Sequence, residues 1–584
     1  MKKRFLQFGM TAKAVMIALL LGVAGKTYAY DFSAVCETGQ TLFYTITDYQ
    51  NHYVSVVSPS ISYNNWGNHP KPAGNMVLPE NITHGGINYR LTSIGYTAFW
   101  DCDDLLSVTI PNSVIEIKGD ETFGAFHGCS NLASITLGNS IESIGQNAFS
   151  GTRWHINQPD GVLYLGNWCI GHKGDLSGEL VINENTIGIA DMAFSSCVNL
   201  TSVIMPNSVN FIGLSSFGNC TGLTSIVIPN SVTSLSGFSG CTGLTTITIP
   251  DSVTSIGEYA FYGCTGLTLL NIGNSVTSIG YHAFHGCHSL TYVTIPKSIT
   301  SFGEYAFGYC THLTTVYFNA ENAEFYASYN YVFLDCSNLT TIYIGPEVQT
   351  ISSSMFSGCP KVHLVIALGS TPTALESGAF SGLAENAMLL VPCGKRMTYF
   401  SAWNMFDFNN IMEDCNTYSV SMNGVGSGGR ISASSTNAQM GEVVELTVTP
   451  NAGMVLASLE VVNASDPSQT IPVMPVGKTA SSFRFVMPPF GVSVLASFAV
   501  GTSVGENEMI DASVYPNPTG GQMRIEAEDL KHISINNMLG QQIYEGEANG
   551  DVFEYDFGKH DAGVYLVRIE STNGVAVKKV LVTR

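Results

Sequence analysis

The chain has 584 residues, of which only 12% are charged, and its formal net charge is −21 because 45 acidic residues outnumber 24 basic ones. A chain of this length exceeds a single core and divides into several domains. Sparse charge together with 59 glycines favours turn-rich β structure over charged helices. The acidic balance repels phosphate backbones and anionic membranes, so we expect no nucleic-acid partner.

The first 29 residues have the pattern of a secretory signal peptide. Three basic residues at positions 2–4 precede an apolar run from Ala14 to Ala24, and small residues flank an expected cut before Tyr30. The apolar run is too short for a stable membrane span, and no later stretch reaches ~18 uninterrupted apolar residues. We therefore expect a mature protein without a transmembrane span.

A repeat with a period of 23 residues runs through the middle of the chain. Cysteines mark it at positions 197, 220, 241, 264, 287 and 310, and the series extends to Cys102, Cys129, Cys336 and Cys359. A unit such as CTGLTTITIPDSVTSIGEYAFYG contains a short strand, a Pro or Gly stop, a second apolar pair and a tight Ala-Phe turn. A constant period of this kind is typical of stacked coils, so each unit predicts one turn of a solenoid.

The strand of each unit alternates between two faces. In one coil we expect Leu223, Ile226 and Ile228 on the buried face and Ser225 and Val227 on the outward face. A lone coil cannot bury its apolar face, whereas parallel strands stacked at roughly 4.8 Å can.

The phenylalanine of each turn is expected to stack behind the sheet as a spine. About twelve coils between residues 105 and 391 would give a sheet ~50 Å long. The spine residues in the sequence are Phe149, Phe194, Phe261, Phe284, Phe307, Phe356 and Phe380.

The cysteine series could indicate a disulfide framework, a metal site or buried free thiols. In-register coils place equivalent side chains side by side with parallel Cβ vectors, which is poor geometry for a bridge. Thr152 and Leu383 occupy the same position in other coils, so we expect small buried groups and free thiols. Cys393 and Cys415 lie outside the series, and the sequence leaves open whether they form a disulfide.

The outward face of the sheet is where a binding protein would work, because its side chains are spared from the core. The third strand positions include Tyr292, Thr315 and Thr341, the fifth include Tyr317 and Tyr343, and neither row carries charge. Tyrosine is favoured at interfaces, although it is also a good strand former. These five residues are the predicted binding site.

The unit IGxxAFxGCxxLTxIxIPxSVTS resembles the BspA-like (Treponema pallidum type) leucine-rich repeat family, from Tyr89 to about Val391. The lead-in YDFSAVCETGQTLFYTIT and the closing VPCG…YFSAW are similar to the flanks of such arrays. We therefore expect a β-rich cap at 30–88 and a solenoid of short strands and turns with a C-terminal cap at 89–415. The resemblance implies cell-surface adhesion. Between Trp154 and Thr186 one coil is longer, and a protruding hairpin is expected.

Residues 416–500 predict a separate β-rich domain, because alternating strands replace the repeat there. The strings GEVVELTVTPNAGM and FVMPPFGVSVLASF are similar to the divergent internalin-type bacterial repeat module, which implies a spacer. Gly424, Gly426 and Gly429 match G-x-G-x-x-G, but the strand RISAS follows instead of a helix. A dinucleotide site is therefore not expected.

Residues 501–511 have no apolar period and predict a linker, and residues 512–584 carry a set of separated motifs. The motif residues are Pro516, Asn517, Pro518, Gly540, Gly563, Tyr565, Lys578 and Lys579. The set resembles the C-terminal sorting domain of the type IX secretion system of Bacteroidetes. It implies an immunoglobulin-like β-sandwich that the type IX machinery recognises, and hence secretion through the outer membrane to the cell surface or the extracellular space.

No catalytic residue, metal site or cofactor is predicted. The sequence contains no H-E-x-x-H, G-x-S-x-G, P-loop or EF-hand pattern. His282, His285 and His288, with His312 one coil on, suggest a metal site, but polar turn positions explain them more simply.

We therefore expect an exported, mainly β protein in which a leucine-rich-repeat solenoid is followed by two β-rich domains. The preferred function is an adhesin for an unidentified host or bacterial surface protein or glycan. The alternative is a structural scaffold of the envelope or a biofilm whose Ser/Thr face packs against other copies. A glycan-active enzyme is the third hypothesis, and it requires two carboxylates that face each other across a pocket.

Overall fold

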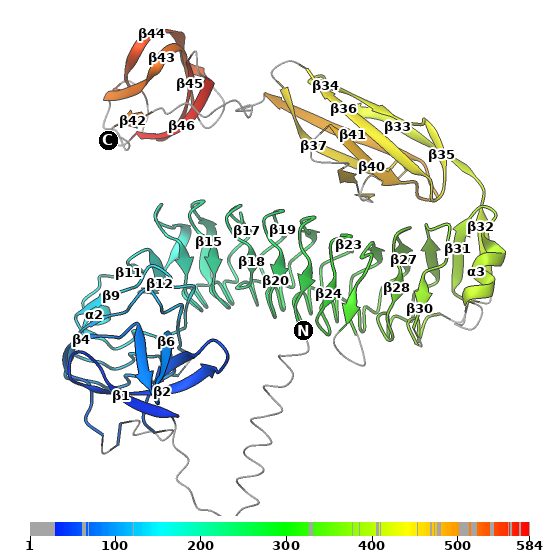
Figure 1. The fold of residues 1–584 in the computed structure, drawn as a ribbon. Helices are drawn as coiled ribbons and strands as arrows, with labels where there is room; N and C mark the ends of the chain where they lie inside the picture. The colour runs from blue at the N-terminus through cyan, green and yellow to red at the C-terminus, as the bar shows by residue number, and fades with distance from the viewer. Residues whose placement is uncertain are drawn as a thin grey trace, which may run out of the picture. The chain divides into compact units, whose positions relative to one another are not determined.

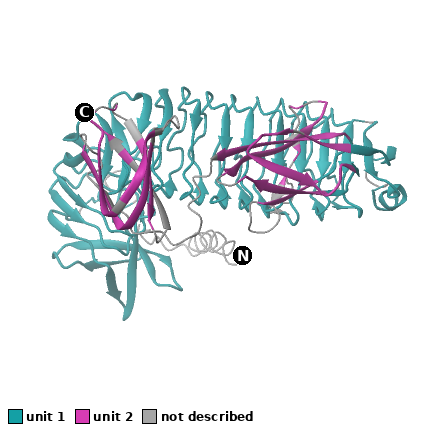
Figure 2. Ribbon diagram, turned by 90° about the horizontal axis from the view of Figure 1, so that it is seen from above, with its two compact units in different colours: residues 1–418, 438–443, 486–489 teal, residues 419–437, 444–485, 490–584 magenta. Residues whose placement is uncertain are grey.

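The computed structural model shows a protein that is mostly β, with almost no helix (Figure 1). It describes residues 30–60, 66–67, 69–120, 122–325, 331–376, 378–384, 386–403, 408, 410–451, 454–465, 467, 470–471, 473–475, 481–500, 513–515, 522–537, 542–558, 560, 563–571 and 574–582. The predicted signal peptide and linker lie outside these residues. The chain forms two compact units: residues 1–418 with 438–443 and 486–489, and residues 419–437, 444–485 and 490–584 (Figure 2).

The N-terminal part of the first unit is a β-rich cap that merges with the solenoid. In its sheet, β1 to β3 form an antiparallel meander, β3 pairs in parallel with β6, and β6 pairs in parallel with the first short solenoid strand. Because a cap strand continues the solenoid sheet, it covers an edge that would otherwise be open to pairing with another chain. The strands are β1 (Phe32–Val35), β2 (Thr41–Asp48), β3 (Tyr53–Val57), β4 (Gly74–Val77), β5 (Asn81–His84) and β6 (Ile87–Ile94).

The solenoid has about thirteen turns, and most coils contribute one longer strand, which has only two residues in β17, and one two-residue strand in a second row. The longer strands are β7 (Leu105–Thr109), β9 (Ser134–Thr136), β13 (Ser177–Val181), β15 (Asn199–Ile204), β17 (Ser225–Ile226), β19 (Thr246–Thr248), β21 (Leu269–Asn271), β23 (Tyr292–Ile295), β25 (Thr315–Phe318), β27 (Thr341–Ile344), β29 (Leu364–Ala367), β31 (Met388–Pro392) and β32 (Asn410–Asp414). The short strands are β8 (Glu116–Ile117), β10 (Ser143–Ile144), β14 (Gly188–Ile189), β16 (Phe211–Ile212), β18 (Ser234–Leu235), β20 (Ser255–Ile256), β22 (Ser278–Ile279), β24 (Ser301–Phe302), β26 (Glu324–Phe325), β28 (Thr350–Ile351) and β30 (Ala374–Leu375).

Equivalent residues of successive coils face each other in parallel pairs. Ser255, Ser278 and Ser301 are register partners in three consecutive short strands. Leu223, Ile226 and Ile228 are buried and Val227 is exposed, as the alternation predicts. The predicted stack of parallel coils is therefore confirmed.

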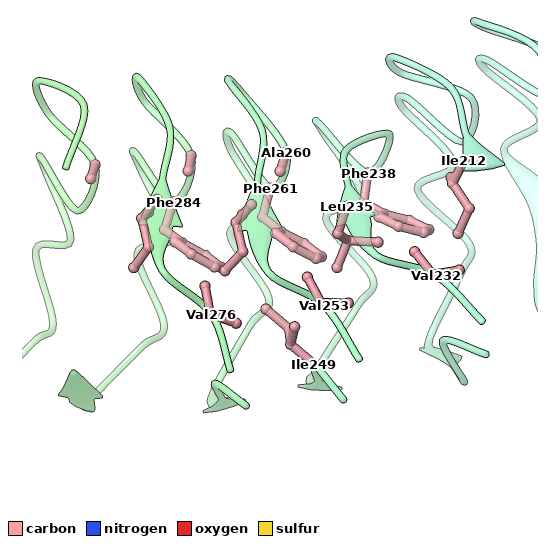
Figure 3. Packing of buried hydrophobic residues seen from close by; sticks show 14 of the residues in the cluster. Ile212, Val232, Leu235, Phe238, Ile249, Val253, Ala260, Phe261, Val276 and Phe284 are labelled. Carbon is pink, nitrogen blue, oxygen red and sulfur yellow. The ribbon is translucent and has the colours of Figure 1, made fainter. Parts of the chain in front are cut away.

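A ladder of phenylalanine rings fills the core behind the sheets, and Figure 3 shows part of it, with Phe238, Phe261 and Phe284 in one row. Neighbouring rings lie nearly parallel, and their centroids are 5.5 and 5.2 Å apart in these two steps. Every predicted spine residue takes part, and the ladder also includes Phe99, Phe126, Phe217, Phe238 and Phe333. Each large buried ring removes apolar surface from water, which stabilises the stack by about 2–3 kcal/mol per ring.

The longer coil contains the expected hairpin. Strands β11 (Gly161–Leu165) and β12 (Trp168–Lys173) pair in antiparallel fashion, and Gly166 takes a positive φ of 57° in the turn between them. The short helix α2 (Arg153–Ile156) precedes the hairpin, and the Thr152 hydroxyl caps it by accepting a hydrogen bond from the His155 amide. Strand β12 then returns to the solenoid by pairing in parallel with β14.

The C-terminal end of the solenoid is closed by helix α3 (Arg396–Trp403), which lies between β31 and β32. The Tyr399 hydroxyl donates to the carbonyl oxygens of Gly369 and Thr371, and the Trp403 indole N–H donates to that of Thr373. A disulfide joins Cys393 to Cys415 in this segment. The last coil is thus tied down by buried aromatic side chains and a covalent link.

The region after the solenoid is β-rich, as predicted. One five-stranded sheet has the order β35-β33-β41-β37-β38, and a four-stranded sheet has the order β34-β36-β40-β39. Their strands are β33 (Thr417–Val425), β34 (Gly429–Ala433), β35 (Asn437–Gln439), β36 (Val443–Pro450), β37 (Met454–Asn463), β38 (Thr470–Ile471), β39 (Met474–Pro475), β40 (Ser482–Val486) and β41 (Val492–Val500).

The C-terminal region has its own core and a single sheet among its described strands. These are β42 (Ser513–Tyr515), β43 (Gln522–Asn537), β44 (Gln542–Asp556), β45 (Gly563–Ser571) and β46 (Gly574–Val582). The resemblance implies two packed sheets, whereas here β43 and β44 are long strands whose register shifts between Glu526 and His532. Residues from both sides of this irregularity, such as Ile525 and Ile533, share one buried cluster.

Candidate functional site

The predicted tyrosine site is only partly open. Tyr317 and Tyr343 are 4% and 5% exposed, and their rings stack with centroids 4.6 Å apart. Tyr317 is the register partner of Tyr343, and Tyr343 is that of the buried Ile366, so three large side chains occupy one row and shield one another. The expectation that Tyr317 and Tyr343 lie on an open surface is therefore wrong.

The other three predicted binding residues form a half-buried row. Tyr292, Thr315 and Thr341 are direct register partners in β23, β25 and β27. They lie next to one another as predicted, but their side chains are neither fully open nor buried. Their role in binding stays a prediction.

A continuous apolar row is exposed on the same sheet at earlier coils. Val181 is the register partner of Ile204, and the same parallel register places Ile204 beside Val227. These side chains are 58%, 49% and 79% exposed. We call Val181, Ile204 and Val227 the apolar row.

The threonines beside the strands hold neighbouring coils together. The Thr268 hydroxyl donates to the Thr245 carbonyl oxygen at 3.0 Å, and the Thr314 hydroxyl donates to the Thr291 carbonyl oxygen at the same distance. On another edge, the Thr277 and Thr300 hydroxyls donate to the carbonyl oxygens of Thr254 and Thr277. Each of these hydroxyls hydrogen-bonds to the preceding coil. The surface beside the strands is therefore polar, and these hydrogen bonds link neighbouring coils.

Sequence reasoning missed a second cluster, which lies on the turns before the regularly spaced cysteines. We call it the aromatic strip, and it consists of Tyr259, Tyr262, Tyr281, His282, His285, Tyr305 and Tyr309. Its signal in the sequence is the run of Tyr and His in three successive turns, which read EYAFY, YHAFH and EYAFGY.

The rings of the aromatic strip stack from coil to coil. Tyr259 lies on His282 with centroids 5.4 Å apart, and His282 lies on Tyr305 with centroids 5.0 Å apart. In a second row, Tyr262 lies on His285 at 5.2 Å. Burial lowers the pKa of His282 and of His285, so both rings are neutral at pH 7.

The histidines of this strip pack against aromatic rings. In the described residues no group of three or more His, Cys, Asp or Glu side chains could hold a metal ion. His288 instead lies 3.2 Å from the Thr311 hydroxyl, and His282 and His285 contact aromatic rings. Contacts within and between the turns therefore account for His282, His285 and His288, the residues that suggested a metal site.

A cavity of about 330 Å³ lies beside the hairpin and is lined by His155, His172 and Asp191, among others. Asp191 is the single carboxylate of its lining, so the cavity does not hold the facing carboxylates that a glycan hydrolase requires.

The His172 ring in this cavity lies close to the Cys197 thiol, with Nε2 3.4 Å from Sγ. His172 Nδ1 is 3.0 Å from the Ala193 carbonyl oxygen, a contact that favours a proton on Nδ1 and leaves Nε2 to accept from the thiol. Burial raises the pKa of Cys197 to about 11, so the group is a protonated thiol at neutral pH. It therefore lacks the thiolate of an activated nucleophile.

The predicted sorting residues fall partly within the described chain. Gly563 begins β45, Tyr565 is buried beside the Phe557 ring, and Lys578 and Lys579 lie in β46. The remaining four, Pro516, Asn517, Pro518 and Gly540, lie outside the described residues.

Three family models match the chain. The model described as BspA type Leucine rich repeat region matches 79–172, 122–237, 235–363 and 321–386, which together cover slightly more than half of the chain. A Divergent InlB B-repeat domain matches residues 418–502, and a Secretion system C-terminal sorting domain matches residues 513–583. A comparison with curated proteins gave no match.

Several solved structures are similar to parts of this chain. A leucine-rich repeat protein from Bacteroides ovatus ATCC 8483 is 22% identical and covers 66% of this chain and 100% of its own, with a TM-score of 0.27. A leucine rich cell surface protein from Faecalibacterium prausnitzii A2-165 is 20% identical over 61% of this chain and 98% of its own, with a TM-score of 0.24. The T. pallidum leucine rich repeat protein is 23% identical over 43% and 87%, with a TM-score of 0.19.

The family models indicate export. The sorting domain marks the chain for type IX secretion to the cell surface or the extracellular space. No enzyme family is among the matches. No helix in the described part of the chain is long and apolar enough to cross a membrane. The chain belongs to the BspA type leucine-rich repeat family and carries a secretion-system C-terminal sorting domain.

Proposed function

We propose that this protein is an adhesin that presents its solenoid to host or partner macromolecules outside the cell. The observation that carries the proposal is the apolar row, because three large apolar side chains are exposed side by side on a hydrogen-bonded sheet of an exported protein. Contiguous exposed apolar patches with a polar rim mark interaction sites, whereas single exposed apolar residues do not. We also propose that residues 1–29 are a signal peptide and that the protein comes from a member of the Bacteroidetes.

The surroundings of the apolar row favour a protein or glycan partner. Ser202 and Ser225 lie in register beside it, and Thr246 and Thr248 follow on the next exposed strand. These side chains offer hydroxyl hydrogen bonds around an apolar centre, which is the usual composition of a binding interface. Glu179, the register partner of Ser202, adds an exposed carboxylate beside the row, and the Ser202 hydroxyl lies 3.4 Å from it.

The test is a binding screen with the purified mature protein against matrix proteins, mucins, glycans and partner cells. The double variant Val227→Asp/Ile204→Asp places two carboxylates in the apolar row, and both positions are exposed, so the fold should be retained. Leu214→Asp is the matched control, because Leu214 is similarly exposed but lies in a turn outside the row. Loss of a wild-type interaction in the double variant and its retention in the control would support the proposal.

Two results would overturn it. The wild-type protein could bind nothing in the screen, or the double variant could bind as well as the wild type. The scaffold alternative predicts instead that the wild type forms large assemblies in light scattering and that the double variant does not.

A further inference from the structure

The aromatic strip contains side chains in a costly backbone conformation. Tyr259, His282, Tyr305 and Tyr309 have φ values between 53° and 58°, and of the aromatic residues in the described chain only His52 shares this left-handed region. Bulky side chains are rarely found there. The equivalent turn positions of other coils take the same conformation with non-aromatic side chains, namely Thr97, Asn147, Met192, Ser215 and Ser354. Aromatic rings have been placed where serine would satisfy the fold, which indicates a role beyond stacking.

The strip begins at a step in the solenoid. The coil before it spans 21 residues from Cys220 to Cys241, two fewer than the usual 23, and residues equivalent to Glu258 and Tyr259 are missing from its turn. At ordinary turns three backbone hydrogen bonds join neighbouring coils, for example from the amides of Tyr259, Phe261 and Gly263 to the next coil. The short turn makes two such bonds to the strip, from Phe238 and Gly240.

This step leaves the first two rings of the strip without aromatic neighbours on one side. Tyr259 and Tyr262 are 40% and 41% exposed, and their ring contacts are all within their own coil or with the next one. The residue before Tyr262 in the stack is the small Ser239. Two ring faces are thus presented toward the shortened coil.

The coils that contain these rings have an acidic sequence. Between residues 251 and 335 the sequence has six carboxylates, Asp251, Glu258, Glu304, Glu321, Glu324 and Asp335, against a single basic residue, Lys297. Glu258 is exposed directly beside Tyr259, and no salt bridge in the described chain uses Glu258 or Glu304. A negative field over open aromatic faces favours a cation.

A contact between a cation and a turn tyrosine already occurs in an earlier coil of the solenoid. Lys118 Nζ lies 5.8 Å from the ring centroid of Tyr96, which occupies the turn position equivalent to Glu258. A lysine can therefore reach a turn-edge tyrosine in this geometry.

We propose that the aromatic strip binds an arginine- or lysine-bearing segment of a partner polypeptide, with a cationic side chain over Tyr259 and Tyr262 and its charge facing Glu258. The neutral rings of His282 and His285 extend the contact along the stack without repelling the cation. This site goes beyond the apolar row and is separate from it, so each can fail without the other.

The experiment measures fluorescence anisotropy of a fluorescein-labelled Gly-Arg-Gly-Arg-Gly-Arg-Gly peptide titrated with the full mature protein. The variant Tyr259→Ser/Tyr262→Ser should bind at least about tenfold more weakly, because two cation–π contacts are lost. Serine occurs naturally at both equivalent positions, as Ser215 and Ser239, so the variant should fold. Glu258→Gln should weaken binding several-fold and reduce its salt dependence.

The matched control is Tyr49→Ser, which removes a more exposed tyrosine in the N-terminal cap and should leave the affinity unchanged. Equal binding of the peptide to the wild type and the double serine variant would overturn the proposal, because the net charge of −21 alone would then account for the interaction. Binding of a labelled neutral oligosaccharide that depends on Tyr259 and Tyr262, without peptide binding, would also overturn it. Retained peptide binding by Val227→Asp/Ile204→Asp separates this result from the test of the apolar row.

Discussion

The Cys264 thiol donates a hydrogen bond to the carbonyl oxygen of Phe238 in the preceding coil, with Sγ 3.1 Å from the oxygen. The same carbonyl accepts the Cys241 amide within its own turn, so both of its acceptor positions are used. The bond recurs along the stack from Cys129, Cys220, Cys241, Cys287, Cys310, Cys336 and Cys359. The cysteine position therefore links each coil to the one before it as well as filling space.

We predict that these thiols are unreactive in the folded protein. Twelve cysteines are free and buried, and burial raises the pKa of Cys264 to about 12. Reactivity needs an accessible thiolate, and neither condition is met at pH 8. Titration with Ellman's reagent should detect almost no thiol in the native protein and all twelve in concentrated guanidinium chloride. Fast labelling of several thiols under native conditions would contradict the buried ladder.

We predict that Phe261→Ala lowers the free energy of unfolding by about 3–5 kcal/mol, because it opens a cavity between two stacked neighbours. The Phe261 ring is fully buried between Phe238 and Phe284. Val227→Ala should change stability by less than about 0.5 kcal/mol, because that side chain is exposed. Chemical denaturation followed by circular dichroism measures both, and equal effects would rule out the ring ladder as a main source of stability.

The repeat architecture could be predicted from the sequence because a stacked fold has one physical solution for each recurring residue. A phenylalanine every 23 residues can be buried only if the coils are in register, and Phe149 and Phe380 lie on the ladder as expected. Thr152 is buried at the cysteine position as expected, but its hydroxyl donates to the Phe149 carbonyl oxygen of its own turn, whereas the thiols donate to the preceding coil.

The binding surface was harder to predict because alternation gives the side of a strand and not its exposure. Tyr317 and Val227 occupy equivalent outward positions, yet the first is buried in a row of large residues and the second is open. The aromatic strip was missed for a related reason. Its residues lie in turns, where the shortened coil before Tyr259 matters more than any periodic pattern.

Deletion of residues 513–583 is expected to abolish export across the outer membrane, because these residues match the sorting domain. The shortened protein should collect inside the cell envelope of a type IX-competent host. Immunoblots of periplasmic, surface and medium fractions measure this. Deletion of residues 418–502, which match the B-repeat domain, is the control and should leave export intact. Equal amounts of both shortened proteins in the medium would contradict a sorting role.

The disulfide between Cys393 and Cys415 is expected to stabilise the C-terminal cap. It closes a segment with a sequence separation of 22, which corresponds to about 3 kcal/mol of restricted unfolded-state entropy. The double variant Cys393→Ala/Cys415→Ala should therefore lower the stability of the cap, measured by protease cleavage near α3. Reduction of the wild-type protein should have the same effect and should not alter the variant.

Alkaline pH is expected to destabilise the solenoid through its buried thiols. Burial raises the pKa of Cys220 and Cys264 to about 12, whereas thiols of the unfolded chain lose their protons near pH 8.5. Above that pH the folded state binds more protons than the unfolded state, so the free energy of unfolding falls as the pH rises. The stabilisation is complete below pH 8.5 and is lost progressively toward pH 12.

Melting temperatures measured from pH 7 to 11 under reducing conditions should decline. The melting temperature of Cys220→Ala/Cys264→Ala should decline less steeply, because this variant has two fewer buried thiols. A flat profile, or parallel profiles for the two proteins, would show that the thiols do not control this pH dependence.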